Sequence, residues 1–112
     1  MPGKKIGFDA VREIGLKLPD VVDGTAKRGF ALKLNGRLLA CEPSNRAAEP
    51  DSLMVRLSFE ERERLLSDSP DVYYLPDHYV KHPCVLVRLD RISRKRLGEL
   101  LKNAWRYGME LG

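Results

Sequence analysis

The dipeptide Asn35-Gly36 separates two short segments that are rich in apolar residues, 30–34 and Arg37–Cys41. Both residues of the dipeptide readily adopt a positive φ, which a type I′ turn requires, so the pattern predicts a β-hairpin with a two-residue turn. With that turn, Leu34 pairs with Arg37 and Leu32 pairs with Leu39. The face predicted to lie on the core carries Phe30, Leu32, Leu34, Leu39 and Cys41. The opposite face carries Ala31, Lys33, Leu38 and Ala40.

Three helices are predicted around this hairpin. Apolar residues recur at helical spacing over 8–18, and Pro19 ends that helix. Ser58 and Glu61 form a capping box, which predicts a short helix to about residue 66. Ser93 is expected to cap the last helix. The apolar stripe of that helix consists of Leu97, Leu100, Leu101, Ala104 and Trp105.

Further strands are predicted at 53–57, 72–75 and 84–89, whereas 20–29 is predicted to be loop. The order of elements is then α-β-β-β-α-β-β-α. This order predicts an α+β fold, in which an antiparallel sheet is backed by helices on one face. We expect a single domain over residues 1–112, with residues 1–7 as a frayed basic lead-in.

Composition fits this picture of a protein with its own core. The chain has 112 residues, of which 43% are hydrophobic, and its net charge is +4 with a pI of about 9.2. The longest strictly apolar runs, 38–41 and 84–87, are far too short for a membrane helix, and residues 1–20 contain no apolar core of the secretory type. We therefore expect a cytoplasmic protein, with Cys41 and Cys84 as reduced core residues.

Several motifs distributed along the chain resemble the bacterial YjbR-like (MmcQ/YjbR) family. The most specific ones are His78-Tyr79, His82-Pro83 and Val85-Leu86-Val87-Arg88-Leu89-Asp90. Supporting matches are Phe8-Asp9-Ala10-Val11-Arg12, Leu18-Pro19, Pro70-Asp71-Val72-Tyr73 and Ala104-Trp105. The resemblance implies a "double wing" fold similar to the bacterial frataxin homologue and to secretion chaperones. It also implies DNA binding, because members of the family commonly carry that label.

Two basic clusters are candidates for contacts with DNA phosphates. Arg94, Lys95 and Arg96 occupy the first turn of the last helix, where the helix dipole is already positive, so this end could collect an anion. Arg91 lies just before them. The second cluster is expected around the hairpin tip and consists of Lys27, Arg28, Lys33 and Arg37. Either cluster could instead be a solvated face. Such contacts would make binding salt-dependent and largely independent of sequence.

A third candidate surface is the face of the sheet that points away from the core. Lys33, Arg56 and Arg88 are expected to project from it, together with Tyr73 or Tyr74. Cations interleaved with an aromatic ring can hold a nucleic-acid backbone and stack a base. The same face could equally bind a protein partner or simply be solvated.

The loop before the last strand offers a possible ligand site made of Tyr74, His78, Tyr79 and His82. Two histidines four residues apart suggest a metal site, but the sequence has no third ligand nearby. The loop could instead form a pocket for a small molecule or anion, or simply pack. Cys84 follows His82 closely, yet neither catalytic residues nor a cofactor site are predicted. The alternative to DNA binding is therefore a non-enzymatic protein-interaction or small-ligand module that uses the surface of residues 73–82.

Overall fold

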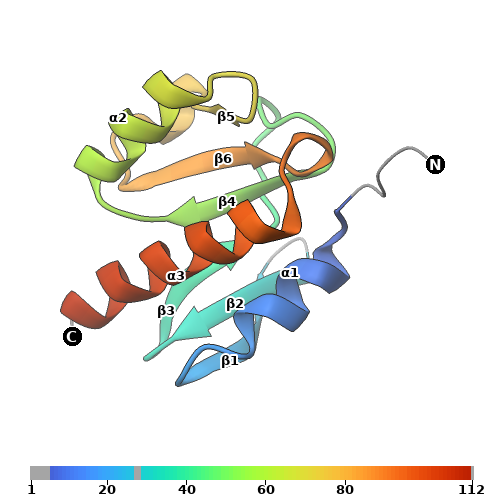
Figure 1. Cartoon of the computed structure of the whole chain (residues 1–112), viewed down its shortest axis with the longest axis vertical. Helices are drawn as coiled ribbons and strands as arrows, with labels where there is room; N and C mark the ends of the chain where they lie inside the picture. The colour runs from blue at the N-terminus through green and yellow to red at the C-terminus, as the bar shows by residue number, and fades with distance from the viewer. Residues whose placement is uncertain (1–5, 27–28, 112) are drawn as a thin grey trace.

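The computed structural model describes residues 6–26 and 29–111, which build one antiparallel sheet in the strand order β1-β2-β3-β4-β6-β5 (Figure 1). The strands are β1 (Val21–Ala26), β2 (Gly29–Leu34), β3 (Arg37–Cys41), β4 (Ser52–Arg56), β5 (Tyr73–Tyr74) and β6 (Cys84–Arg88). The helices are α1 (Phe8–Gly15), α2 (Phe59–Asp68) and α3 (Arg94–Glu110), with short 3-10 turns η1 (Asp77–Tyr79) and η2 (Leu89–Arg91). The predicted α+β class with an antiparallel sheet is confirmed. Residues 1–5 of the predicted lead-in lie outside the described residues.

The hairpin between β2 and β3 has the predicted turn. Asn35 and Gly36 both have positive φ, 52° and 81°, and Leu34 pairs with Arg37. The predicted pairing of Leu32 with Leu39 is wrong, because a register shift between Leu32 and Lys33 pairs Leu32 with Ala40. An extra residue in one strand reverses which side chains face the core beyond it.

The shift changes the position of two side chains in β3. Ala40 is fully buried in the core beneath the helices, although it was predicted to lie on the opposite face. Cys41 pairs with Ala31 and with Met54, so it lies on the face away from the helices and its predicted place on the core face is wrong. It is nevertheless buried.

Strand β1 was not predicted, and the expected loop over 20–29 is wrong for residues 21–26 and for Gly29, which begins β2. This strand pairs with β2 along its whole length, from Val21 opposite Leu34 to Ala26 opposite Gly29. It is an edge strand, and its Val22 side chain is exposed. Asp23 and Gly24 are also residues that strands disfavour, which explains why the sequence pattern was weak.

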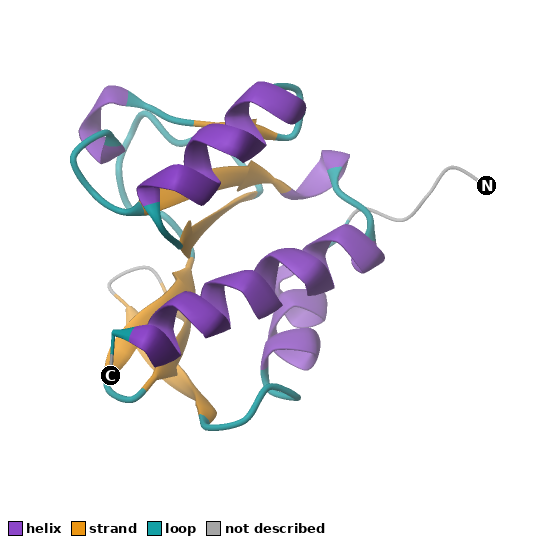
Figure 2. Ribbon diagram, turned by 60° about the vertical axis from the view of Figure 1, so that its left-hand side comes forward, coloured by secondary structure: helices purple, strands orange, loops and turns teal. Residues whose placement is uncertain are grey.

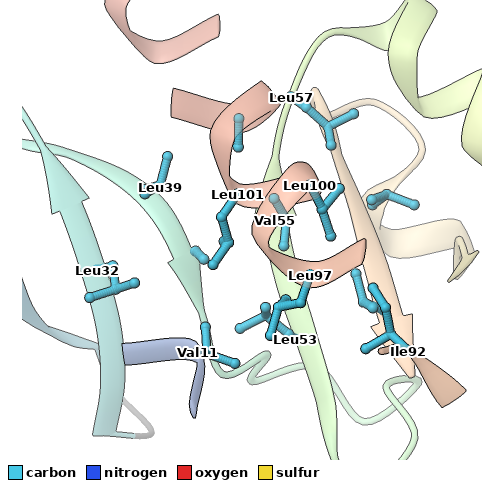
Figure 3. Close-up of a cluster of buried hydrophobic side chains, with 14 of the residues drawn as sticks. Val11, Leu32, Leu39, Leu53, Val55, Leu57, Ile92, Leu97, Leu100 and Leu101 are labelled. Carbon is cyan, nitrogen blue, oxygen red and sulfur yellow. The ribbon is translucent and has the colours of Figure 1, made fainter. Parts of the chain in front are cut away.

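Helices α1 and α3 lie side by side over one face of the sheet (Figure 2). The leucines of α3 point into the main core, as Figure 3 shows for Leu97, Leu100 and Leu101 beside Leu53 and Val55. Both predicted N-caps are confirmed, since the Ser58 and Ser93 hydroxyls accept hydrogen bonds from backbone N–H groups three residues on. Helix α1 ends at Gly15, earlier than the predicted residue 18.

The other face of the sheet is covered in part by loops. Tyr79, Cys84 and Leu86 form a second buried cluster. Four further residues pack against it: Ala48, Met54, Tyr74 and Leu75. Ala48 comes from the loop between β3 and β4, and Tyr79 from the 3-10 turn that precedes β6. The sheet therefore has a helix-covered core on one face and a smaller, loop-covered cluster on the other.

Candidate functional site

The start of α3 carries the cations predicted to contact phosphate, and the structure gives them different surroundings. Arg94 is paired with Glu13 of α1 at 3.0 Å between Nη2 and Oε1. Arg96 donates to the Ser69 hydroxyl at 2.8 Å and lies 5.9 Å from the Tyr73 ring centroid. It forms no ion pair with a carboxylate in the described part of the chain. Lys95 is exposed. Arg94 is thus partly neutralised, whereas Lys95 and Arg96 keep their charge available.

The hairpin tip does not join this cluster. Asn35 at the tip contacts Met109 near the end of α3, with its Nδ2 3.8 Å from the Met109 Sδ. Helix α3 has 17 residues, which at 1.5 Å per residue is about 25 Å. Arg37 is therefore at the opposite end of α3 from Arg94. Lys27 and Arg28 lie outside the described residues.

A groove between α2 and α3 extends the basic cluster along the helix. It has a volume of about 470 Å³, and its lining includes Arg64, Arg96, Lys102 and Arg106. Asp68 and Glu99 also line it. Arg64 is bound on both sides by Glu61 and Asp68, so Arg96, Lys102 and Arg106 supply its unpaired positive charge. Lys102 and Arg106 were absent from the predicted site, although both follow Lys95 at helical spacing (seven and eleven residues on).

The residues predicted to form a ligand loop do not share one surface. Tyr79 is buried, and burial raises the pKa of its hydroxyl. The Tyr74 hydroxyl is hydrogen-bonded to the Ser52 hydroxyl and accepts from the backbone N–H of Glu49. His78 and His82 are exposed, with ring centroids 6.3 Å apart. Of the four predicted residues, His78 and His82 are therefore the exposed ones.

Arg62 of α2 holds this loop from beneath. It is 6% exposed, and its Nη1 donates to the backbone carbonyls of Val80 at 3.1 Å and His82 at 2.8 Å. Its guanidinium lies 4.7 Å from the Phe59 ring centroid. No sequence pattern distinguishes this arginine, because it lies among alternating acidic and basic residues on a helix that looks exposed. Arg62 therefore orders the backbone of the loop that carries His82.

The surface predicted from Lys33, Arg56 and Arg88 is only partly available. Arg88 makes a bidentate pair with Glu49, at 3.0 and 2.8 Å, and also donates to the carbonyls of Pro70 and Asp71. Tyr73 is buried on the helix side, so Tyr74 is the aromatic residue on this face, with Arg88 4.4 Å from its ring centroid. Arg88 thus links the loop before β4 to the loop before β5.

The open part of this sheet face forms a pocket of about 500 Å³. Its lining residues are Arg37, Leu38, Met54, Arg56, His82, Pro83 and Cys84. Burial raises the pKa of the Cys84 thiol to about 11, so this thiol is neutral at physiological pH and is a poor nucleophile despite its closeness to His82 in the sequence. We refer to these seven residues as the sheet-face pocket.

Within residues 6–26 and 29–111, no three His, Cys, Asp or Glu side chains gather into a group suited to a metal ion. None of the helices found there has the length and apolar character needed to cross a bilayer.

The fold defines the chain as a small α+β protein with a six-stranded antiparallel sheet. The same fold occurs in the crystal structure of Deinococcus radiodurans protein DR2400, a DUF419 domain, which is the YjbR/MmcQ family. The TM-score is 0.70, and the match covers 94% of this chain and 80% of that one, at 22% sequence identity. The likeness confirms the fold that the family resemblance implied.

Sequence comparison adds relatives whose role is not described. The chain is 41% identical over 56 residues to uncharacterized proteins of Mycobacterium tuberculosis and Mycobacterium bovis. This match covers 49% of the chain and 43% of each relative, so the chain aligns with less than half of their length. No family model matches the chain.

Proposed function

We propose that this chain is a non-enzymatic member of the YjbR-like family that binds double-stranded DNA through phosphate contacts along α3. The observation that carries the proposal is a set of exposed or groove-lining cations without an ion pair to any described carboxylate. These cations are Lys95, Arg96, Lys102 and Arg106. The family resemblance and the shared fold with DR2400 support the assignment to the family.

The geometry of α3 suits a phosphate backbone. Its apolar stripe is buried, so the helix is fixed against the sheet and its other face is free for contacts. Lys95 and Arg106 are eleven residues apart, which corresponds to about 16 Å along the helix axis. That length matches about five base-pair steps at 3.4 Å each. The positive end of the helix dipole adds to the attraction at Arg96.

Binding of this kind is expected to depend on salt and not on sequence. Each phosphate contact that is lost should flatten the plot of log affinity against log salt concentration by about 0.9. Glu99 lies between Lys95 and Lys102 on the helix surface, so it repels phosphate. Its replacement by Gln should therefore strengthen binding.

The test is fluorescence anisotropy with a labelled DNA duplex over a salt series. The variant is the double charge reversal Arg96→Glu/Lys102→Glu, chosen because Arg94 already has a carboxylate partner. The matched control is Lys17→Glu/Arg46→Glu, which makes the same change in net charge at exposed positions outside α3. Circular dichroism verifies that both variants remain folded.

We expect the α3 variant to lose affinity equally for unrelated duplexes and to flatten the salt dependence by about 1.8. The control should retain most of the wild-type affinity, and Glu99→Gln should bind more tightly than the wild type. The proposal is refuted if the wild type does not bind at low salt, or if the α3 variant and the control bind equally well.

A further inference from the structure

The sheet-face pocket combines an apolar lining with unpaired positive charge. Leu38, Met54, Pro83 and the neutral thiol of Cys84 provide the apolar part. They project from the face of the sheet opposite the helices, since Met54 and Cys84 alternate with core residues of β4 and β6. The volume of about 500 Å³ is in the usual range for small-molecule sites.

The charge around this pocket has one sign. Both arginines of its lining, Arg37 and Arg56, are positive, and the lining contains no carboxylate. Neither arginine has an ion pair or a side-chain hydrogen bond with any described residue. Arg56 is partly buried, so its guanidinium is less well hydrated than that of a fully exposed arginine. The α2–α3 groove differs in this respect, because Asp68 and Glu99 lie among its cations.

The wall that carries His82 is held in place by the fold. Arg62 donates to the His82 carbonyl at 2.8 Å, and the same carbonyl accepts from the backbone N–H of Cys84 at 2.8 Å. The Pro83 carbonyl accepts from the backbone N–H of Leu57 at 2.9 Å. A pocket whose walls are already ordered loses little conformational entropy when a ligand binds.

We propose that the sheet-face pocket binds a small organic carboxylate, with its apolar body on Leu38 and Met54 and its carboxylate on Arg37 and Arg56. Backbone N–H groups, which dominate many phosphate sites, are committed to sheet pairing along β4 and β6. The head group is therefore recognised chiefly by the two guanidinium groups, whose planar fork matches a carboxylate in bidentate geometry. This site is separate from the α3 surface.

The test uses octanoate as the probe and follows backbone amide shifts by NMR during titration. Octan-1-ol keeps the apolar chain without the charge, acetate keeps the charge without the chain, and octyl phosphate changes the head group. The variants are Arg37→Gln and Arg56→Gln. Arg46→Gln, at an exposed arginine in the loop between β3 and β4, is the matched control.

We expect octanoate to shift the amides of Leu38, Met54 and Cys84, and to bind more tightly than octanol, acetate or octyl phosphate. Loss of one charged hydrogen-bonding partner should lower the affinity for octanoate about tenfold in either pocket variant. Arg46→Gln should leave this affinity unchanged. The inference is overturned if these amides do not move, if octanol binds as well as octanoate, or if both pocket variants bind like the wild type. Tighter binding of octyl phosphate would overturn the choice of a carboxylate. The Arg96→Glu/Lys102→Glu variant should bind octanoate normally, which separates this result from the fate of the DNA proposal.

Discussion

Replacement of Arg62 by Met is expected to destabilise the protein strongly, although Arg62 lies on a helix that is otherwise rich in exposed charge. Methionine can fill much of the space beside Phe59 but cannot donate a hydrogen bond. The carbonyls of Val80 and His82 would lose the donor that reaches them at 3.1 and 2.8 Å. The substitution therefore keeps much of the packing and removes these hydrogen bonds. It also removes the 3.1 Å pair between Arg62 Nε and the exposed Glu63, which contributes less than about 1 kcal/mol.

The magnitude follows from the number and burial of these bonds. A hydrogen bond to a charged group contributes about 1.5–3 kcal/mol, so two such bonds set an upper range of about 3–6 kcal/mol. The desolvation penalty for burying the guanidinium offsets part of the stabilisation from these hydrogen bonds. We expect a loss of about 3 kcal/mol for Arg62→Met, which is a large fraction of the ~5–15 kcal/mol typical for a domain. Arg62→Lys should lose less, because an ammonium can still reach one carbonyl.

The assay is equilibrium unfolding in urea, with Arg64→Met as the matched control on the same helix. The Arg64 side chain is 56% exposed and pairs with Glu61 and Asp68, and exposed pairs are worth less than about 1 kcal/mol. With a urea dependence of about 1–3 kcal/mol per molar, a 3 kcal/mol loss lowers the midpoint by about 1–3 M. Equal midpoints for the two variants would refute the reasoning.

Two further predictions concern the ion pair between Glu49 and Arg88 and the Asn35-Gly36 turn. Interaction with Arg88 lowers the pKa of Glu49 from its ordinary 4.5, so its stabilising effect is complete above that pH and is lost as the pH falls through the lowered value. Because Glu49 is about half exposed, Glu49→Gln should lower the free energy of unfolding by less than about 1 kcal/mol at pH 7. In urea unfolding near pH 2–3, the difference between this variant and the wild type should vanish. A difference that stays constant with pH would contradict this. Gly36→Ala should lower stability in urea by about 1 kcal/mol because φ is 81°, whereas Gly36→Asn should lose less; equal losses would argue against a strained turn.

The sequence predicted those parts of the fold whose signal is local. The Asn35-Gly36 turn and the caps at Ser58 and Ser93 are set by residues within three positions of each other, and all three are confirmed. The order of the elements also followed, apart from β1. Strand β1 is held by its partner and not by its own composition, so only the pairing with β2 reveals it.

Register and side-chain pairing were harder to predict, since both depend on contacts distant in the sequence. The shift after Leu32 moves Cys41 to the other face, and nothing in the hairpin sequence itself requires an extra residue there. Arg62 reaches carbonyls 18 and 20 residues away. The sequence predicted two basic clusters, one at the hairpin tip and one at the start of α3, but it did not indicate that the length of α3 separates them.

The arrangement of the cations carries more information about binding than the net charge of +4 does. Several arginines have structural partners: Arg12 with Asp23, Arg64 with Glu61, Arg88 with Glu49 and Arg94 with Glu13. Among the cations without an ion pair to a described carboxylate, one group lies along α3 and another borders the sheet-face pocket on the opposite side of the sheet. A cation left unpaired beside an apolar surface favours a ligand that supplies both a charge and a hydrophobic body, whereas an open row on a helix favours an extended polyanion. The same residue type should therefore serve two kinds of ligand on the two faces of one sheet.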